Sequence, residues 1–214
     1  RLRGISTTAD QIVVTPGAKP IMFFTILALA QSGDEVIYPN PGFPIYESVI
    51  KFAGARPVSI PLREKRDFNL DLNQLKDLVT DRTRLIIINS PQNPTGGVLP
   101  PEDLEAIAEI AVARRIPVLA DEIYSRILYG GEFHSISIYD GIEDLLIILD
   151  GFSKTYAMTG WRIGYGVMPT DLAAHITRLM TNSNSCTASF TQRAALAALQ
   201  GPHDAVVEMV AEFK

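Results

Sequence analysis

Lys154 and Arg162 are two residues of this chain whose types and setting suit chemistry. Lys154 follows the apolar run Leu145–Leu149, which predicts a buried strand, and Phe152 and Met158 flank it. Apolar surroundings destabilise the charged form of a lysine, so its pKa falls and its neutral amine becomes a nucleophile. We therefore expect Lys154 to form a Schiff base with a carbonyl compound, although a solvated surface lysine is the ordinary alternative. The guanidinium of Arg162 suits bidentate phosphate binding, and a surface salt bridge is its alternative.

A carboxylate, Asp121, directly follows another apolar run, Pro117–Ala120, and Tyr124 comes three residues later. A carboxylate at the end of a buried strand needs a cationic partner or hydrogen bonds. Asp121 is therefore a candidate site residue, and a helix cap is the alternative.

Three turns also follow apolar runs. Residues 15–19, Thr-Pro-Gly-Ala-Lys, open a predicted helix, whose free N–H groups suit an anion or form a simple capping turn. Residues 38–43 contain two prolines and a glycine, so they form a stiff turn that presents Phe43 to a ligand or to the core. Residues 89–97 include Asn-Pro-Thr-Gly, which turn chemistry alone would explain.

Short apolar runs alternate with helical patterns along the whole chain. The runs that predict strands are Ile12–Thr15, Glu35–Tyr38, Pro57–Ile60, Leu85–Asn89, Pro117–Ala120, Leu145–Leu149 and Ile163–Met168. The helical patterns are Ala18–Gln31, Tyr46–Phe52, Asp71–Val79, Pro101–Arg114, Asp171–Met180 and Thr191–Gln200. This alternation predicts an α/β fold with a mainly parallel seven-stranded sheet and helices on both faces. Ligands of such sheets bind at the carboxyl ends of the strands, where the candidate residues fall.

The composition is that of an ordinary globular protein. The 214 residues are 47% hydrophobic and 20% charged, with a net charge of −5, and no basic cluster indicates nucleic-acid binding. No apolar run is long enough to span a membrane, and the three histidines are too scattered for a metal site. A single cysteine, Cys186, excludes an internal disulfide and indicates a reducing compartment, so we expect a cytoplasmic protein.

Ser153-Lys154 followed by residues 160–165, Gly-Trp-Arg-Ile-Gly-Tyr, resembles the lysine motif of the class I/II aminotransferases. These are pyridoxal-phosphate (PLP) enzymes of fold type I, the aspartate aminotransferase-like superfamily. The upstream turns match the family's motifs in the family's order, so the resemblance covers nearly the whole chain. It implies that Lys154 forms the internal aldimine and that Arg162 binds the cofactor phosphate.

The resemblance also implies a role for each of the other candidates. Gly17, Ala18, Lys19 and Ser153 would bind the phosphate, Phe43 would stack on the pyridine ring, Asn93 and Tyr124 would bond the phenolic oxygen, and Asp121 would keep the ring nitrogen protonated. It further implies a cis Asn93–Pro94 bond. Pro20 stands where the family often has a polar residue, so one possible N–H donor to the phosphate is missing.

The implied function is transfer of an amino group between an amino acid and a 2-oxo acid, with Lys154 moving the proton. Two alternatives share these motifs: other PLP chemistry, such as a β-lyase or a synthase, and a non-catalytic ligand-sensing domain. Product analysis separates the first, and an attached DNA-binding domain would indicate the second.

We expect residues 1–214 to be the PLP-binding large domain alone, without the N-terminal segment and the C-terminal small domain of the family. In the family a small-domain arginine binds the substrate carboxylate. Arg178 and Arg193 are poor substitutes because they fall in predicted helices with other uses. The longer parent is then expected to be a homodimer, and this chain alone to be nearly inactive.

Overall fold

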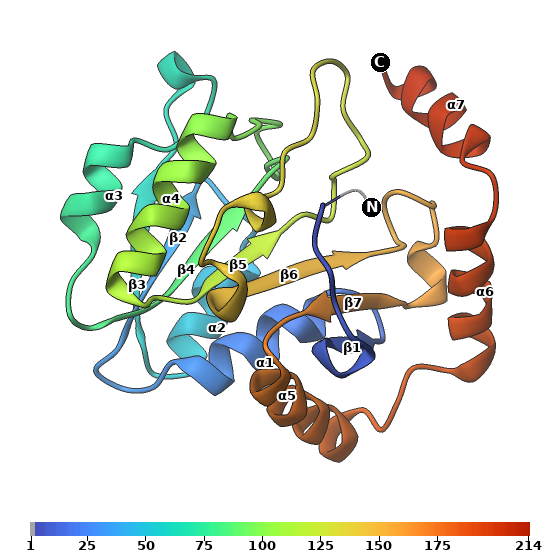
Figure 1. Cartoon of the computed structure of the whole chain (residues 1–214), viewed down its shortest axis with the longest axis horizontal. Coiled ribbons are helices and arrows are strands. Elements are labelled where there is room, and N and C mark those ends of the chain that lie inside the picture. The colour runs from blue at the N-terminus through green and yellow to red at the C-terminus, as the bar shows by residue number, and fades with distance from the viewer. Residues whose placement is uncertain (1–2) are drawn as a thin grey trace.

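A computed structural model of the chain describes residues 3–214, which fold around one seven-stranded sheet (Figure 1). The strands are β1 (Ile12–Thr15), β2 (Glu35–Asn40), β3 (Arg56–Pro61), β4 (Thr83–Asn89), β5 (Val118–Asp121), β6 (Leu146–Gly151) and β7 (Gly164–Val167). Their order in the sheet is β1-β7-β6-β5-β4-β2-β3. All are parallel except β7, which runs antiparallel to both β1 and β6. The predicted α/β fold with a mainly parallel seven-stranded sheet is confirmed.

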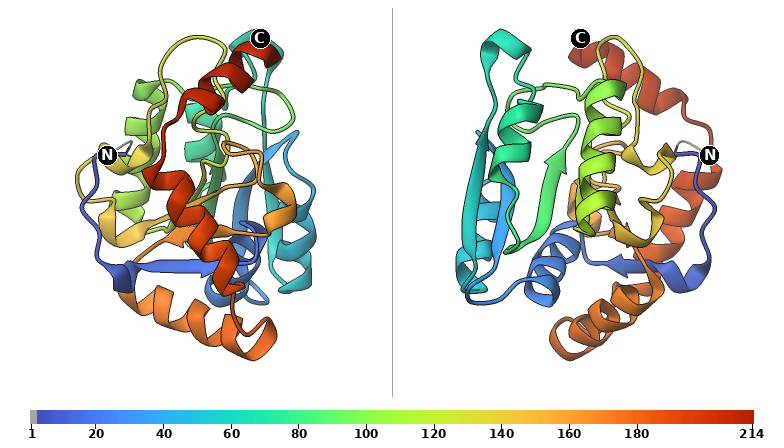
Figure 2. Two further views of the ribbon diagram at one scale, coloured as in Figure 1. Left: turned by 90° about the vertical axis from the view of Figure 1, so that its right-hand side faces the viewer. Right: turned by 60° about the vertical axis from the view of Figure 1, so that its left-hand side comes forward.

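Helices cover both faces of the sheet (Figures 1 and 2). They are α1 (Lys19–Leu29), α2 (Ile45–Phe52), α3 (Leu72–Leu78), α4 (Pro101–Arg114), α5 (Thr170–Ser183), α6 (Ser189–Gln200) and α7 (Asp204–Phe213). Alternate residues of a strand point to opposite faces. Accordingly Ile87 of β4 packs in the core that includes α1, α2 and α5, whereas Ile86 and Ile88 pack in the core that includes α3 and α4.

The final helix, α7, is the one that the sequence patterns did not predict. It follows α6 along one side of the molecule, at the right of Figure 1 and facing the viewer in the left panel of Figure 2. None of its residues is buried, and Val207 and Phe213 are exposed. Val206, Met209, Val210 and Phe213 nevertheless recur at helical spacing, so the sequence carries a signal for this helix that the prediction overlooked.

The antiparallel direction of β7 brings its first residues to the carboxyl ends of the neighbouring strands. Gly164, which begins β7, pairs with Thr15 at the end of β1 and with Gly151 at the end of β6. A Cβ atom on Gly164 would lie 2.5 Å from the backbone nitrogen of Ala18, so only glycine allows this close approach. The turns after β1, β4, β5 and β6 and the turn before β7 therefore meet at one edge of the sheet.

Among the helices of residues 3–214, none is both long enough and apolar enough to cross a membrane. Within the same residues, no group of three or more histidine, cysteine or acidic side chains is placed to hold a metal ion.

Candidate active site

A cavity of about 410 Å³ lies at this edge of the sheet. It is lined by all but one of the candidate residues: Ala18, Lys19, Phe43, Asn93, Asp121, Tyr124, Ser153, Lys154 and Arg162. The exception, Gly17, lies behind the side chain of Arg162, where an added Cβ atom would come within 2.3 Å of Nη2. Residues separated by up to 144 positions in the sequence are thus gathered in one hollow, because each follows or precedes a strand that ends there.

Asp121 lines the cavity and is only 5% exposed. Burial raises the pKa of its carboxyl to about 6, hydrogen bonds from Tyr46 Oη (2.7 Å) and the Ile123 amide (3.3 Å) act in the opposite sense, and the charge of Asp150 adds to the rise. No ion pair with Asp121 occurs within residues 3–214. A cation or an N–H donor in the cavity would therefore find a poorly compensated acceptor.

Asn89, at the end of β4, holds the next turn against β5. Its Nδ2 donates to the carbonyl oxygens of Asp121 (2.9 Å) and Pro91 (3.1 Å), and its Oδ1 accepts from the Asn93 amide (2.8 Å). The Asn93–Pro94 bond is cis, as predicted. These contacts fix Asn93 beside the cavity, and all polar atoms of the Asn89 side chain are used structurally.

Three cationic side chains, Lys19, Lys154 and Arg162, line the cavity. Arg162 has a left-handed backbone (φ 51°), and its Nη1 donates to the carbonyl oxygen of Thr159 at 2.9 Å. Lys19 begins α1, and its Nζ lies 5.4 Å from the centre of the Phe43 ring. In the part of the chain that the structure describes, neither Arg162, Lys19 nor Lys154 forms an ion pair with a carboxylate.

The start of α1 adds backbone dipole to these charges, because helix N-termini carry free N–H groups and partial positive charge. Pro20 takes the second position of α1, where a missing N–H does not break the helix ladder. Two cations beside a helix N-terminus, Lys19 and Arg162, are suited to a doubly charged anion such as a phosphate monoester.

Lys154 is exposed rather than surrounded by apolar side chains, so the expectation that its flanking residues desolvate it is wrong. Phe152 and Met158 are buried, but they turn away and pack with Ile163 and Ala195. The turn after β6 thus divides its residues between a small core on one side and the cavity on the other. Lys154 Nζ lies on the cavity side, 5.4 Å from the centre of the Tyr124 ring.

Two residues of the site are missed by the sequence patterns. Asn89 is a polar residue at the end of the most apolar strand, and that position is a signal by which it could be found. Tyr46, in the first turn of α2, is fully buried and reads in the sequence as an ordinary core aromatic. No sequence signal indicates that its hydroxyl reaches Asp121.

The family model of the aminotransferases of class I and II matches residues 1–214. The chain belongs to that family. A probable aspartate/prephenate aminotransferase of Aquifex aeolicus is 42% identical over 209 residues, which are 96% of this chain and 53% of that protein. An aspartate aminotransferase of Geobacillus stearothermophilus is 38% identical and is covered to 55%.

Solved aminotransferase structures have the same fold. An aromatic aminotransferase from Pyrococcus horikoshii superposes with a TM-score of 0.96 at 37% identity, over 100% of this chain and 58% of that one. The aspartate aminotransferase of Thermus thermophilus with maleate gives a TM-score of 0.94 at 34% identity, over 98% of this chain and 55% of that one. The chain therefore spans about half the length of the aminotransferases that it matches.

Membership of this aminotransferase family implies pyridoxal phosphate as the cofactor in general terms. The chemistry of the cavity fits that molecule. A phosphate suits the cationic side, a flat ring suits the wall formed by Phe43, a protonated ring nitrogen suits the buried Asp121, and an aldehyde suits the amine of Lys154.

Proposed function

We propose that residues 1–214 are the cofactor-binding large domain of a PLP-dependent aminotransferase, which transfers an amino group between an amino acid and a 2-oxo acid. The observation that carries the proposal is one cavity lined by groups of opposite charge. The buried carboxylate of Asp121 lines it, and so do Lys19, Lys154 and Arg162, which have no carboxylate partners in the described part of the chain. The aminotransferase names of the relatives support the same reaction class.

Each lining residue would then hold one part of the cofactor. Arg162, Lys19 and Ser153, with the amides of Gly17 and Ala18, would bind the phosphate. Phe43 would cover one face of the ring, Asn93 and Tyr124 would donate to the phenolic oxygen, and Asp121 would accept the ring N–H. When bound, pyridoxal phosphate supplies an aldehyde for amines and a protonated ring that accepts electrons.

Lys154 has two tasks in this proposal. With pyridoxal phosphate bound, its Nζ would hold the cofactor through the aldehyde. The same amine, when free, would take the proton from the α-carbon of an amino acid substrate. Asp121 would stay ionised next to a protonated ring nitrogen and would oppose loss of that proton, because the positive charge would offset the burial that raises the pKa of this carboxyl.

The substrates proposed are amino acids and their 2-oxo acids, of the acidic and aromatic classes named for the relatives. The contact for a substrate α-carboxylate is expected outside this chain. Arg178 and Arg193 are exposed on α5 and α6, and neither lines the cavity. Loss of a bidentate contact to the substrate removes two charge-assisted bonds of roughly 1.5–3 kcal/mol each, so we expect negligible turnover from the 214 residues alone. We also expect at most weak cofactor binding by these residues without the rest of the enzyme.

We further propose that the longer enzyme is a homodimer, as the family resemblance implies. A cytoplasmic location is consistent with the single, exposed, unpaired thiol of Cys186.

The test uses a longer chain that contains these residues, loaded with pyridoxal phosphate and mixed singly with aspartate, phenylalanine and other amino acids. An aminotransferase converts each accepted amino acid to its 2-oxo acid and then aminates a second oxo acid. Release of ammonia would instead indicate lyase chemistry. Cofactor binding without any product would indicate a sensing domain.

A further inference from the structure

Two buried carboxylates lie next to the candidate site without lining it. Glu122 follows Asp121 directly, and Asp150 stands four residues before Lys154 on β6. They are 4% and 7% exposed, and neither side chain belongs to the lining of the cofactor cavity. Buried carboxylates strongly destabilise a fold unless a cation and hydrogen bonds compensate them.

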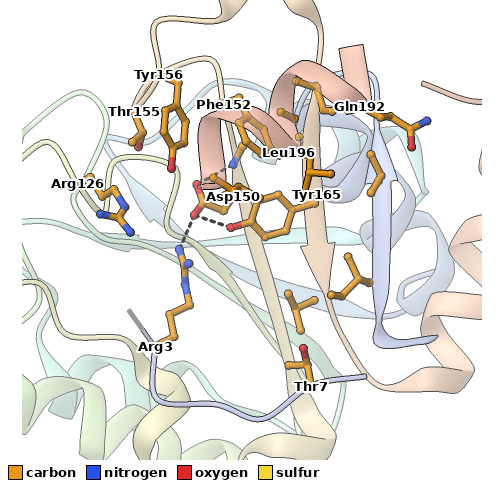
Figure 3. A pocket seen from close by; sticks show the side chains of 18 of the residues that line it. Arg3, Thr7, Arg126, Asp150, Phe152, Thr155, Tyr156, Tyr165, Gln192 and Leu196 are labelled. Carbon is orange, nitrogen blue, oxygen red and sulfur yellow. Dashed lines mark hydrogen bonds and ion pairs between the residues drawn. The ribbon is translucent and has the colours of Figure 1, made fainter. Parts of the chain in front are cut away.

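Arg3 supplies that cation from the far N-terminal end of the described chain. Its Nε donates to Glu122 Oε2, and its Nη2 donates to Asp150 Oδ2 at 2.6 Å. Figure 3 shows Arg3 pointing toward Asp150 and the hydroxyl of Tyr165 meeting the same carboxylate, at 3.1 Å. Ser135 Oγ donates to the other oxygen of Glu122 at 2.6 Å. Every oxygen that faces Arg3 is thus engaged in a closed polar cluster.

This cluster spans the ends of two adjacent strands. Asp121 of β5 pairs in register with Leu149 of β6, and the Glu122 amide donates to the Leu149 carbonyl oxygen at 3.0 Å. Beyond that bond the chains diverge, β5 into the Tyr124 turn and β6 into the Lys154 turn. The guanidinium of Arg3 bonds Glu122, directly after β5, and Asp150, on β6, and so joins the two strand ends where they diverge. A guanidinium can bond two carboxylates at once in a fixed geometry, which an ammonium cannot do.

Arg3 also compensates negative charge around Asp121. The titratable groups that act on this carboxylate are Tyr46 from α2 and Asp150 from β6, and Tyr124 and Lys154 line the same cavity. Burial raises the pKa of Glu122, and the charge of Arg3 lowers it. Without Arg3, the buried charge of Asp150, which acts on Asp121, would have no neighbouring guanidinium.

We propose that Arg3 is a positioning residue for the cofactor site, which acts through Glu122 and Asp150 to hold the Asp121 end of β5 against the strand end that leads to Lys154. The inference rests on the function proposed above. The claim that Arg3 holds the two strand ends together does not depend on any ligand. An experiment can therefore contradict this claim without contradicting the proposed function, and the reverse.

The first experiment uses the 214-residue chain without cofactor. Arg3→Met is compared with Arg56→Met. Arg56 lies on the edge strand β3, and its replacement removes an arginine that pairs with the buried carboxylate of Glu35 at 2.7 Å. We expect Arg3→Met to speed amide hydrogen exchange at Glu122 by about tenfold or more and to raise the pKa of Asp121, as followed by carboxyl NMR. Arg56→Met should leave both unchanged. Equal exchange and equal titration in the two variants would overturn the proposal.

Arg3→Lys separates charge from geometry and provides a second variant if Arg3→Met fails to fold. Lysine keeps the positive charge, so the pKa of Asp121 should stay near its unsubstituted value. It cannot span both carboxylates, so exchange at Glu122 should remain fast. Slow, unchanged exchange in Arg3→Lys would show that charge alone suffices and that Arg3 does not position the strand ends.

The second experiment measures pyridoxal phosphate binding through quenching of Trp161, the single tryptophan, which precedes Arg162. We expect the dissociation constant to rise about tenfold in Arg3→Met and Arg3→Lys and less than about twofold in Arg56→Met. Unchanged affinity in both Arg3 variants would overturn the proposal. If the unsubstituted chain binds no cofactor, the proposed function fails for this chain, while the exchange data still decide the role of Arg3.

Discussion

The hydroxyl of Tyr46 donates a 2.7 Å hydrogen bond to Oδ2 of Asp121, and both side chains are buried. The bond joins α2 to the end of β5 beneath the cavity. It leaves Oδ1, which the Ile123 amide contacts at 3.3 Å, as the less strongly held oxygen. Tyr46 therefore sets the orientation in which Asp121 meets a ligand.

Replacing Tyr46 by phenylalanine removes this bond at nearly constant volume. A buried hydrogen bond to a charged group contributes roughly 1.5–3 kcal/mol, so Tyr46→Phe should lower the free energy of unfolding by about that amount at neutral pH. The pKa of Asp121 should rise, because the lost bond favoured the ionised form. Urea unfolding and carboxyl NMR measure the two effects.

Tyr139→Phe is the matched control for Tyr46→Phe. The hydroxyl of Tyr139 donates to the carbonyl oxygen of Pro101, at the exposed start of α4, at 2.6 Å. It should shift neither the pKa of Asp121 nor the stability by more than about 1 kcal/mol. A Tyr46→Phe protein as stable as this control would show that the Tyr46–Asp121 hydrogen bond does not stabilise the fold.

The raised pKa of Asp121 predicts a pH dependence of stability in the cofactor-free chain. The folded state favours the protonated carboxyl, so its stabilising contribution is complete below the ordinary pKa of 3.8 and is lost as the pH rises through about 6. About two pKa units correspond to roughly 3 kcal/mol. Asp121→Asn stays neutral at every pH and lacks this loss. Between about pH 4 and pH 7, the stability of the unsubstituted chain should fall relative to that of Asp121→Asn.

Urea unfolding of both proteins across that range checks the prediction, and pyridoxal phosphate supplies an internal control. A bound ring N–H beside Asp121 compensates the carboxylate, so the difference between the two proteins should shrink when the cofactor is present. Parallel stability curves without cofactor would show that burial does not perturb Asp121 as described.

Gly17→Ala should weaken phosphate binding by displacing Arg162. Gly17 has a φ of +86°, and the new Cβ would lie 2.3 Å from Arg162 Nη2. Gly33 has a similar φ of +94° with open space around its Cβ position, so Gly33→Ala carries the same backbone strain without the clash. We expect both variants to lose about 1 kcal/mol of stability or more, and only Gly17→Ala to bind pyridoxal phosphate at least about tenfold more weakly. Equal pyridoxal phosphate affinity in the two variants would show that Arg162 does not bind the phosphate.

Much of this fold follows from the sequence because its strands are almost wholly apolar. β4 and β6 appear as unbroken runs, and parallel strands covered on both faces require such runs. The candidate residues were found because each stands in a turn at a strand end and matches a motif of the aminotransferase family. Helix α7 was overlooked although Val206, Met209, Val210 and Phe213 recur at helical spacing. The antiparallel direction of β7 leaves no trace in a pattern of alternating strands and helices.

Side-chain direction is the part that local sequence does not determine. Lys154 was expected among apolar neighbours, but the turn sends Phe152 and Met158 into a separate core and leaves the lysine exposed. The partnership of Arg3 with Asp150 crosses 147 positions of sequence and depends on tertiary packing alone. Contacts of this kind become visible only when the sheet has been assembled.

Borohydride reduction of the folded chain mixed with pyridoxal phosphate is the most direct test of the account. The reagent converts a C=N bond between a lysine and the cofactor to a stable amine, which peptide mass spectrometry then locates. We predict a pyridoxyl group on Lys154, its loss in Lys154→Ala, and its retention in Lys19→Ala at lower cofactor affinity. An adduct that forms at comparable yield on another lysine of folded Lys154→Ala would contradict the central claim that Lys154 carries the cofactor.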